Sequence, residues 1–119
     1  MTSVATVTVW VDDPAALAEW YVAHTGLGIV QQTPRFALLG GDGGAAIGFH
    51  VGEPVATPER VQFHVEVDDV DAVVERLTAQ GVVFDEPPTD RPWGVRSASC
   101  TDPAGHSVEF TTRFPQPGA

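Results

Sequence analysis

The sequence predicts an α+β fold made of two βαβββ modules, and three observations support that prediction. The chain has 119 residues, which is enough for a single domain. A segment beginning near Val9 is repeated 56 residues later, near Val65. In both copies apolar residues first alternate, as in a strand, and then recur at helical spacing. We therefore expect one domain, residues 1–119, whose modules span about 3–51 and 61–112 with a linker at 52–60.

The first module begins with a predicted strand and helix. Valine occupies every second position from Val7 to Val11, which predicts a strand with one apolar face. Asp13 followed by Pro14 is typical of a helix start, and Gly26 of a helix end. The three strands expected after this helix span residues 28–32, 35–39 and 45–51.

The second module repeats this order. Phe63 and Val65 alternate with polar residues, Asp69 is placed to cap a helix, and Gly81 is placed to end it. The proline-rich segment 87–93 is expected to form a loop. The three strands expected after the helix span residues 82–85, 95–100 and 107–112.

One face of each predicted sheet carries the candidate binding residues. A helix must cover the apolar face, so the alternate residues of each strand point to the other face. An ordinary solvated face is one interpretation, but Trp10 is costly to leave in water and Gly48 leaves room beside it. We therefore expect a ligand cavity. Its candidate ligand-binding residues are Thr8, Trp10, Phe36, His50, Gln62, His64, Glu66, Trp93 and Glu109.

The charge excludes some partners. The chain has 6 Lys+Arg against 16 Asp+Glu, a net charge of −10, and all its cations are arginines. Such a chain repels nucleic acid and anionic membrane surfaces, so a cationic or neutral small molecule is the expected partner. The single cysteine, Cys100, is expected to be a buried, inert thiol. No segment approaches the ~20 apolar residues of a membrane span, and we expect a cytoplasmic protein.

Three strings are together recognisable: TGLG at 25–28, WGVR at 93–96 and DPAGH at 102–106. With the repeat, they make the chain resemble the vicinal oxygen chelate superfamily, from about Val4 to Thr112. This superfamily includes glyoxalase I, extradiol dioxygenases, fosfomycin-resistance enzymes and bleomycin-resistance proteins. The resemblance implies a curved mixed sheet cleft with helices on the outer face, commonly completed in a homodimer.

The resemblance also implies positions for metal ligands. They fall at Thr6, Gly48, Gln62 and Glu109, of which only Glu109 is a strong ligand. Catalytic sites for divalent metals need about three His or carboxylate donors, so we expect no metal cofactor. The alternative is a divalent metal ion at a shifted site. Two residues along a strand displace a side chain by about 6.6 Å, so its donors must meet at a new point. Those donors are His50, His64 and Glu109.

These observations favour a metal-independent small-molecule binding protein of the bleomycin-resistance/glyoxalase-like type. It would sequester a cationic or aromatic drug or metabolite. The alternative is an enzyme, a lyase, isomerase or dioxygenase, which uses the shifted metal site or an acid–base pair drawn from His64, Glu66 and Glu109. A third possibility, an interaction module, rests only on the acidic surface, and the position of Trp10 argues against it.

Three further residues have structural interpretations. His24 is expected in the last turn of the first helix, where a cation interacts favourably with the carbonyl groups. His106 is expected to be solvated in a turn. Arg96 is expected either to contact acidic neighbours or to line the cleft.

Overall fold

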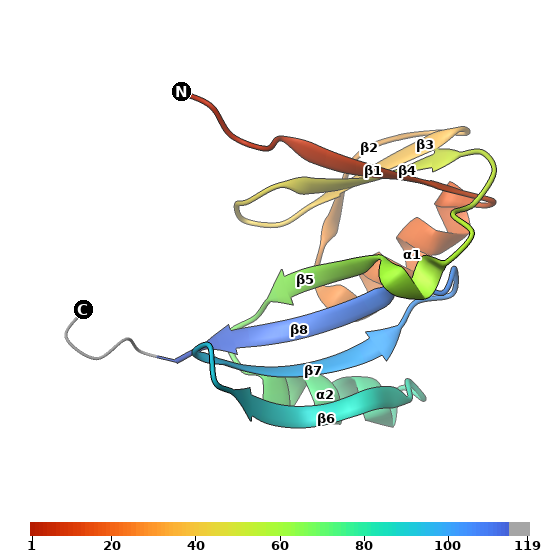
Figure 1. The fold of residues 1–119 in the computed structure, drawn as a ribbon. Coiled ribbons are helices and arrows are strands. Elements are labelled where there is room, and N and C mark those ends of the chain that lie inside the picture. Colours follow the sequence, from red (N-terminus) through yellow and green to blue (C-terminus); the bar gives the residue numbers. More distant parts are fainter. Residues whose placement is uncertain (115–119) are drawn as a thin grey trace. The chain divides into compact units, whose positions relative to one another are not determined.

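A computed structural model describes residues 1–114, and its ribbon shows the βαβββ order twice (Figure 1). The chain divides into two compact units, Met1–Pro58 and Glu59–Ala119. Each unit has one four-stranded mixed sheet and one α-helix, which confirms the predicted fold class. Within the described part of the chain, no helix is long and apolar enough to cross a membrane.

The first unit has strand order β1-β4-β3-β2. β1 and β4 run parallel, and the other neighbouring pairs are antiparallel. The register of β1 and β4 places Thr8 opposite Gly48 and Trp10 opposite His50. The elements are β1 (Thr6–Val11), α1 (Pro14–Thr25), β2 (Gly28–Thr33), β3 (Phe36–Gly40) and β4 (Ala46–Val51).

Helix α1 begins and ends where its sequence signals predict. The side chain of Asp13 accepts a hydrogen bond from the backbone N–H of Ala16 at 3.1 Å, which satisfies a donor of the first turn. Gly26 ends the helix with φ of 85°, a conformation that favours glycine. Tyr21 is fully buried between α1 and the sheet, with its ring centroid 5.3 Å from that of Phe49. The helix therefore covers the apolar face of its sheet.

The second unit repeats this topology, with strand order β5-β8-β7-β6 and β5 parallel to β8. A short 3₁₀ turn at Pro58–Arg60 lies within the segment predicted as a linker. Helix α2 buries Val70 and Leu77, and the side chain of Asp69 caps its first turn. The elements are β5 (Gln62–Glu66), α2 (Val70–Ala79), β6 (Phe84–Arg91), β7 (Val95–Thr101) and β8 (Ser107–Arg113).

Strand β6 corrects the prediction of a loop at 87–93. Pro87 and Pro88 lie inside β6, which runs to Arg91 and pairs with β7. Proline is tolerated there because β6 is an edge strand and its register shifts at two places. Only a tight turn around Trp93 remains between β6 and β7.

The prediction that His106 is solvated is wrong. Its side chain is only 1% exposed, because the imidazole contacts the buried carboxylate of Asp102 in the turn before β8. One carboxylate oxygen of Asp102 accepts from the backbone N–H groups of Ala104 and His106, and the other lies 2.9 Å from Nδ1 of His106. The ring of Phe63 packs against the imidazole at 5.5 Å, nearly perpendicular to it. The DPAGH string therefore encodes a structural turn that buries the side chains of Asp102 and His106.

Cys100 is fully buried in β7, as predicted. Burial raises the pKa of its thiol to about 11, and the carboxylates of Asp85 and Asp102 add to that shift. The thiolate is the reactive form of cysteine, so this thiol is inert in the folded protein.

Candidate functional site

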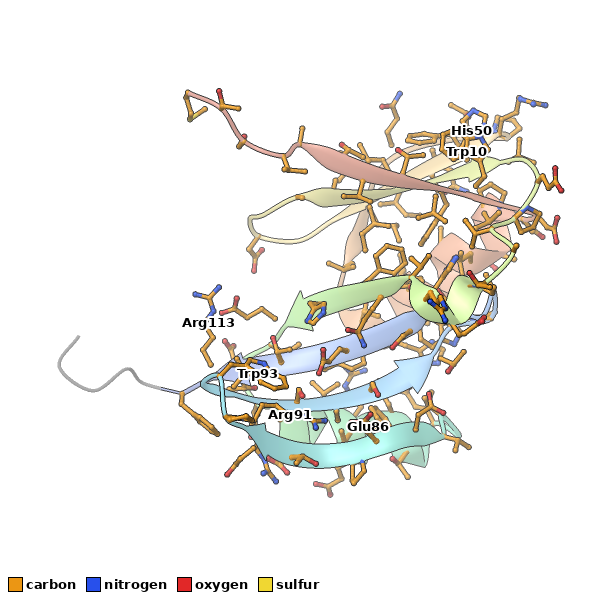
Figure 2. The ribbon with its side chains drawn as sticks, viewed as in Figure 1. Trp10, His50, Glu86, Arg91, Trp93 and Arg113 are labelled. Atoms are coloured by element: carbon orange, nitrogen blue, oxygen red, sulfur yellow. The ribbon has the colours of Figure 1, made fainter. Side chains whose placement is uncertain are left out.

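The first sheet brings together Trp10, Phe36 and His50 on one face. Trp10 and Phe36 lie opposite His50 from β1 and β3, on either side of β4. The ring centroid of His50 is 5.9 Å from that of Trp10 and 6.1 Å from that of Phe36. We call this surface, with Thr8 and Gly48, the aromatic face; Figure 2 shows Trp10 and His50 on it.

Two glycines let these rings lie against the sheet. A Cβ atom at Gly48 would lie 2.8 Å from Oγ1 of Thr8 and 3.1 Å from the ring of Phe36. A Cβ atom at Gly52 would overlap the indole of Trp10. Sequence reasoning found Gly48 but placed Gly52 in the linker. The available signal for Gly52 was its position directly after β4, next to the end of the strand that carries Trp10.

His50 adds a hydrogen-bonding atom to the aromatic face. Its Nδ1 lies 2.8 Å from the carbonyl oxygen of Val51. Because a carbonyl can only accept, Nδ1 carries the proton, and Nε2 of the neutral ring is an acceptor. Trp10 is 49% exposed, so its indole has surface free for a ligand.

The second sheet presents a polar face opposite α2. His64 lies opposite Glu109 in the register of β5 and β8, and Nδ1 of His64 is 3.1 Å from Oε2 of Glu109. The glutamate side chain is 13% exposed and that of His64 is 59% exposed. The carboxylate therefore holds one ring nitrogen and leaves the rest of the imidazole open to solvent.

The other predicted residues of this face also have partners. Nε2 of Gln62 donates to Oγ of Ser107 at 3.0 Å. Glu66 lies 3.4 Å from the guanidinium of Arg113, and both side chains are exposed. Glu66 is therefore close to a cation that sequence reasoning did not consider, because the last strand was predicted to stop at Thr112. The continued alternation of residues 107, 109, 111 and 113 was the signal that could have found it.

Sequence reasoning also missed Arg91 and Glu86, because the sequence predicts a strand over residues 82–85 only, whereas β6 runs from Phe84 to Arg91. The guanidinium of Arg91 donates to Oε2 of Glu86 at 2.6 Å and to Oγ of Ser97 at 2.9 Å. Trp93 follows Arg91 in the turn and is 70% exposed. Figure 2 shows Trp93, Arg91 and Arg113 at the same end of the second sheet.

Arg96 does not belong to the polar face. It donates to Asp71 on α2 at 2.8 Å and to Asp90 on β6 at 2.9 Å. These hydrogen bonds raise the pKa of Arg96, and its guanidinium lowers the pKa of the Asp71 carboxyl. Of the two interpretations left open by the sequence, the structure supports contact with acidic neighbours.

His24 lies in the last turn of α1, as expected, and its Nδ1 donates to the carbonyl oxygen of Trp20 at 2.7 Å.

The residues present do not fit the divalent metal that the resemblance implies. Of the four corresponding positions, Thr6 has a neutral hydroxyl and Gly48 has no side chain. The amide of Gln62 is bonded to Ser107, which leaves Glu109 as the strong donor. Among residues 1–114, no group of three or more His, Cys, Asp or Glu side chains could hold a metal ion. Of these four positions, only Glu109 therefore supplies a carboxylate of the kind that divalent metals prefer.

Comparison with known proteins agrees with this architecture. The profile of the Glyoxalase/Bleomycin resistance protein/Dioxygenase superfamily matches residues 3–110. The chain belongs to this superfamily. No curated protein sequence matches it.

Several solved structures superpose on 94% or more of this chain. TioX from Micromonospora sp. ML1 is 31% identical, covers 95% of this chain and 100% of its own, and has a TM-score of 0.74. A glyoxalase/bleomycin resistance protein/dioxygenase from Nocardioides is 24% identical over 100% of this chain and 89% of its own, with a TM-score of 0.75. Lactoylglutathione lyase from Agrobacterium tumefaciens is 20% identical over 94% of both chains, with a TM-score of 0.75. The last two likenesses concern the fold alone.

Proposed function

We propose that this superfamily member is a metal-independent small-molecule binding protein that sequesters a cationic or aromatic drug or metabolite. The observation that carries the proposal is the aromatic face, where Trp10, His50 and Phe36 lie side by side over Gly48 and Gly52. A protein that only binds needs a preformed surface and no bond-making groups.

The aromatic face suits a planar ligand. Stacking between aromatic rings contributes about 0.5–1.5 kcal/mol beyond the burial of area, and a cation over an indole gains a similar amount. The rings contact one another and Gly48 and Gly52 before any ligand arrives, so little conformational freedom is lost on binding. Nε2 of His50 can accept a hydrogen bond from a ligand donor and so fix its orientation.

Metal independence rests on the chemistry of the donor positions. Gly48 is packed against Thr8 and Phe36, so even a side chain introduced there would have to displace them. The net charge of −10 supports a small-molecule partner rather than nucleic acid or a membrane surface. We also propose that the protein is cytoplasmic and forms a homodimer. Light scattering of the purified protein tests the homodimer.

The proposal is tested by thermal shift with a panel of planar aromatic antibiotics and metabolites, because a ligand that binds only the folded state raises the melting temperature. Trp10→Ala should abolish the shift given by each hit. Val22→Ala, at an exposed position of α1, is the matched control and should keep it. A panel with no hit, or a hit unaffected by Trp10→Ala, contradicts the proposal.

A second candidate is supported by the contact between His64 and Glu109. The carboxylate holds Nδ1 of His64, which leaves Nε2 as a general base that could take a proton from a bound ligand. Mass spectrometry of each hit after long incubation separates the two functions. Conversion of the ligand with turnover, lost in His64→Gln while binding persists, would establish an enzyme and contradict pure sequestration.

A further inference from the structure

We propose that the aromatic face selects planar heteroaromatic ligands that carry an N–H donor on their edge, with His50 as the specificity-determining residue. The inference rests on the proposed function, narrows its ligand class and concerns the first unit alone. Three observations carry it: the imidazole has a fixed tautomer, it lies between two aromatic rings, and the strands of this face present no charged side chain.

The tautomer of His50 is fixed by the backbone of its own strand. Nδ1 lies 2.8 Å from the carbonyl oxygen of Val51, which can only accept, so Nδ1 carries the proton. The backbone around this carbonyl is held on both sides. The N–H of Val51 donates to the carbonyl of Arg35 at 2.9 Å. The N–H of Gly52 donates to the carbonyl of Val11 at 3.0 Å. The neutral imidazole therefore presents an acceptor, and no donor, at Nε2.

Nε2 is open to a ligand. It is the ring nitrogen farther from the backbone, and His50 is only half-buried. Within the described part of the chain, every buried side-chain nitrogen or oxygen has a hydrogen-bond partner. The hydrogen bond of His50 uses Nδ1, so Nε2 is not one of these buried atoms and is exposed to solvent. A ligand donor at Nε2 therefore replaces a water molecule rather than a protein group.

Two rings bring the edge of a planar ligand close to Nε2. Trp10 on β1 and Phe36 on β3 both lie opposite His50, one on each side of β4. Figure 2 shows Trp10 and His50 at the same end of the first sheet. The interplanar angle with the imidazole is 40° for Trp10 and 53° for Phe36. A ligand that packs on either ring therefore has His50 beside its edge, where an N–H group can reach Nε2.

The other polar groups of this face do not distinguish a donor from an acceptor. Directly opposed residues of neighbouring strands project to the same face, so the registers of β1 to β4 assign its members. No charged residue is among these strand positions, all of which the structure describes. Hydroxyl and amide side chains can both donate and accept, which leaves His50 as the group that prefers a donor. The polar members besides His50 are Thr6, Thr8, Gln31 and Thr33.

His50 therefore treats two kinds of ligand edge differently. An N–H group donates to Nε2 and keeps a hydrogen bond in place of the one it made to water. A ring oxygen or an unprotonated ring nitrogen brings a lone pair against the lone pair of Nε2. Such an acceptor loses its water without a replacement, which is unfavourable.

The test compares two uncharged tricyclic probes of the same shape, acridone and xanthone. Acridone has an N–H group in its central ring, and xanthone has an oxygen at that position, so the pair isolates the donor. The dissociation constant of each probe is measured by equilibrium dialysis. We expect acridone to bind the unaltered protein about tenfold more tightly than xanthone, because only acridone gains the hydrogen bond to Nε2.

The decisive variant is His50→Phe, which keeps a ring between Trp10 and Phe36 but removes Nε2. The preference for acridone should fall from about tenfold to below about twofold. His50→Gln covers the case in which His50→Phe fails to fold. Its amide can turn either its oxygen or its NH₂ group to the ligand, so the preference should again be lost. His24→Phe is the matched control, because α1 covers the other face of the sheet, and it should keep the preference.

The outcomes separate this inference from the function on which it rests. If neither probe binds the unaltered protein, the proposed function fails for uncharged planar ligands, and the inference fails with it. If both probes bind and xanthone binds as tightly as acridone or more tightly, the function stands and the inference is overturned. A preference for acridone that persists in His50→Phe and His50→Gln would also overturn it, because the donor would then contact another group.

Discussion

Replacement of Asp102 tests whether the DPAGH turn is the structural element that the contacts describe. In Asp102→Ala, the backbone N–H groups of Ala104 and His106 and the imidazole of His106 lose their shared acceptor. Hydrogen bonds to a charged group each contribute about 1.5–3 kcal/mol to the free energy of unfolding. Removal of the carboxylate also removes the unfavourable free energy of burying it, which offsets part of the lost hydrogen bonding. We expect the free energy of unfolding to fall by about 3–5 kcal/mol, a large share of the 5–15 kcal/mol typical of a domain.

The assay is urea denaturation followed by circular dichroism, with the free energy extrapolated to water. Asp102→Asn keeps an acceptor for the two backbone groups, so it should cost less than Asp102→Ala. Asp42→Ala, at an exposed position between β3 and β4, is the control and should change the free energy by less than about 0.5 kcal/mol. A loss below about 1 kcal/mol in Asp102→Ala would show that Asp102 does not hold the turn together, because three hydrogen bonds to a buried carboxylate contribute more than that.

Three other predictions concern the fold. Gly26→Ala should lower the free energy of unfolding by about 1–2 kcal/mol in a urea titration, because φ is 85° at that position. Gly28 also has open space for a Cβ atom but no positive φ, so Gly28→Ala should lower the free energy of unfolding by less than half as much. Arg96→Gln should remove stability at pH 7 but not at low pH. Arg96 lowers the pKa of the Asp71 carboxyl below its ordinary value of 3.8, so the stabilisation is full above pH 3.8 and is lost as the pH falls through the pKa of the folded protein. Denaturation of the unaltered protein and of Arg96→Gln from pH 2 to pH 7 should show their difference in free energy of unfolding shrinking below pH 3.8. Cys100, whose pKa is raised to about 11, should react with a thiol reagent at pH 8 at less than about 1% of the rate of the unfolded chain, and fast labelling of the folded protein would contradict its burial.

The parts of the fold that could be predicted have local causes. Asp13 and Asp69 cap helices through hydrogen bonds to residues three positions later, so a short string of sequence contains both partners. The alternation around Val9 and Val65 likewise reports which face of a strand is buried. The repeat then extended these local signals to the whole architecture.

The parts that could not be predicted depend on partners distant in sequence or on strand position. Pro87 usually argues against a strand, but at a sheet edge its missing N–H costs nothing. His106 lies in a turn, which suggests exposure, yet Phe63 from another strand covers it.

The candidate site shows the same division. Periodicity placed Trp10 and His50 on one face, and the register of β1 and β4 confirms that they lie side by side on neighbouring strands. The pairing of Glu66 with Arg113 was missed, because it requires the register of β5 and β8 and one more residue at the end of the last strand. Only the alternation of residues 107–113 pointed to that extra residue.

The central claim, that this protein binds an aromatic small molecule without a metal, is tested most directly by calorimetric titration of one thermal-shift hit with and without a chelator. We expect the same Kd after exhaustive treatment with EDTA as after addition of Zn²⁺, Mn²⁺ or Ni²⁺, and no measurable binding in Trp10→Ala. Binding that disappears with EDTA and returns with one of these ions would contradict it.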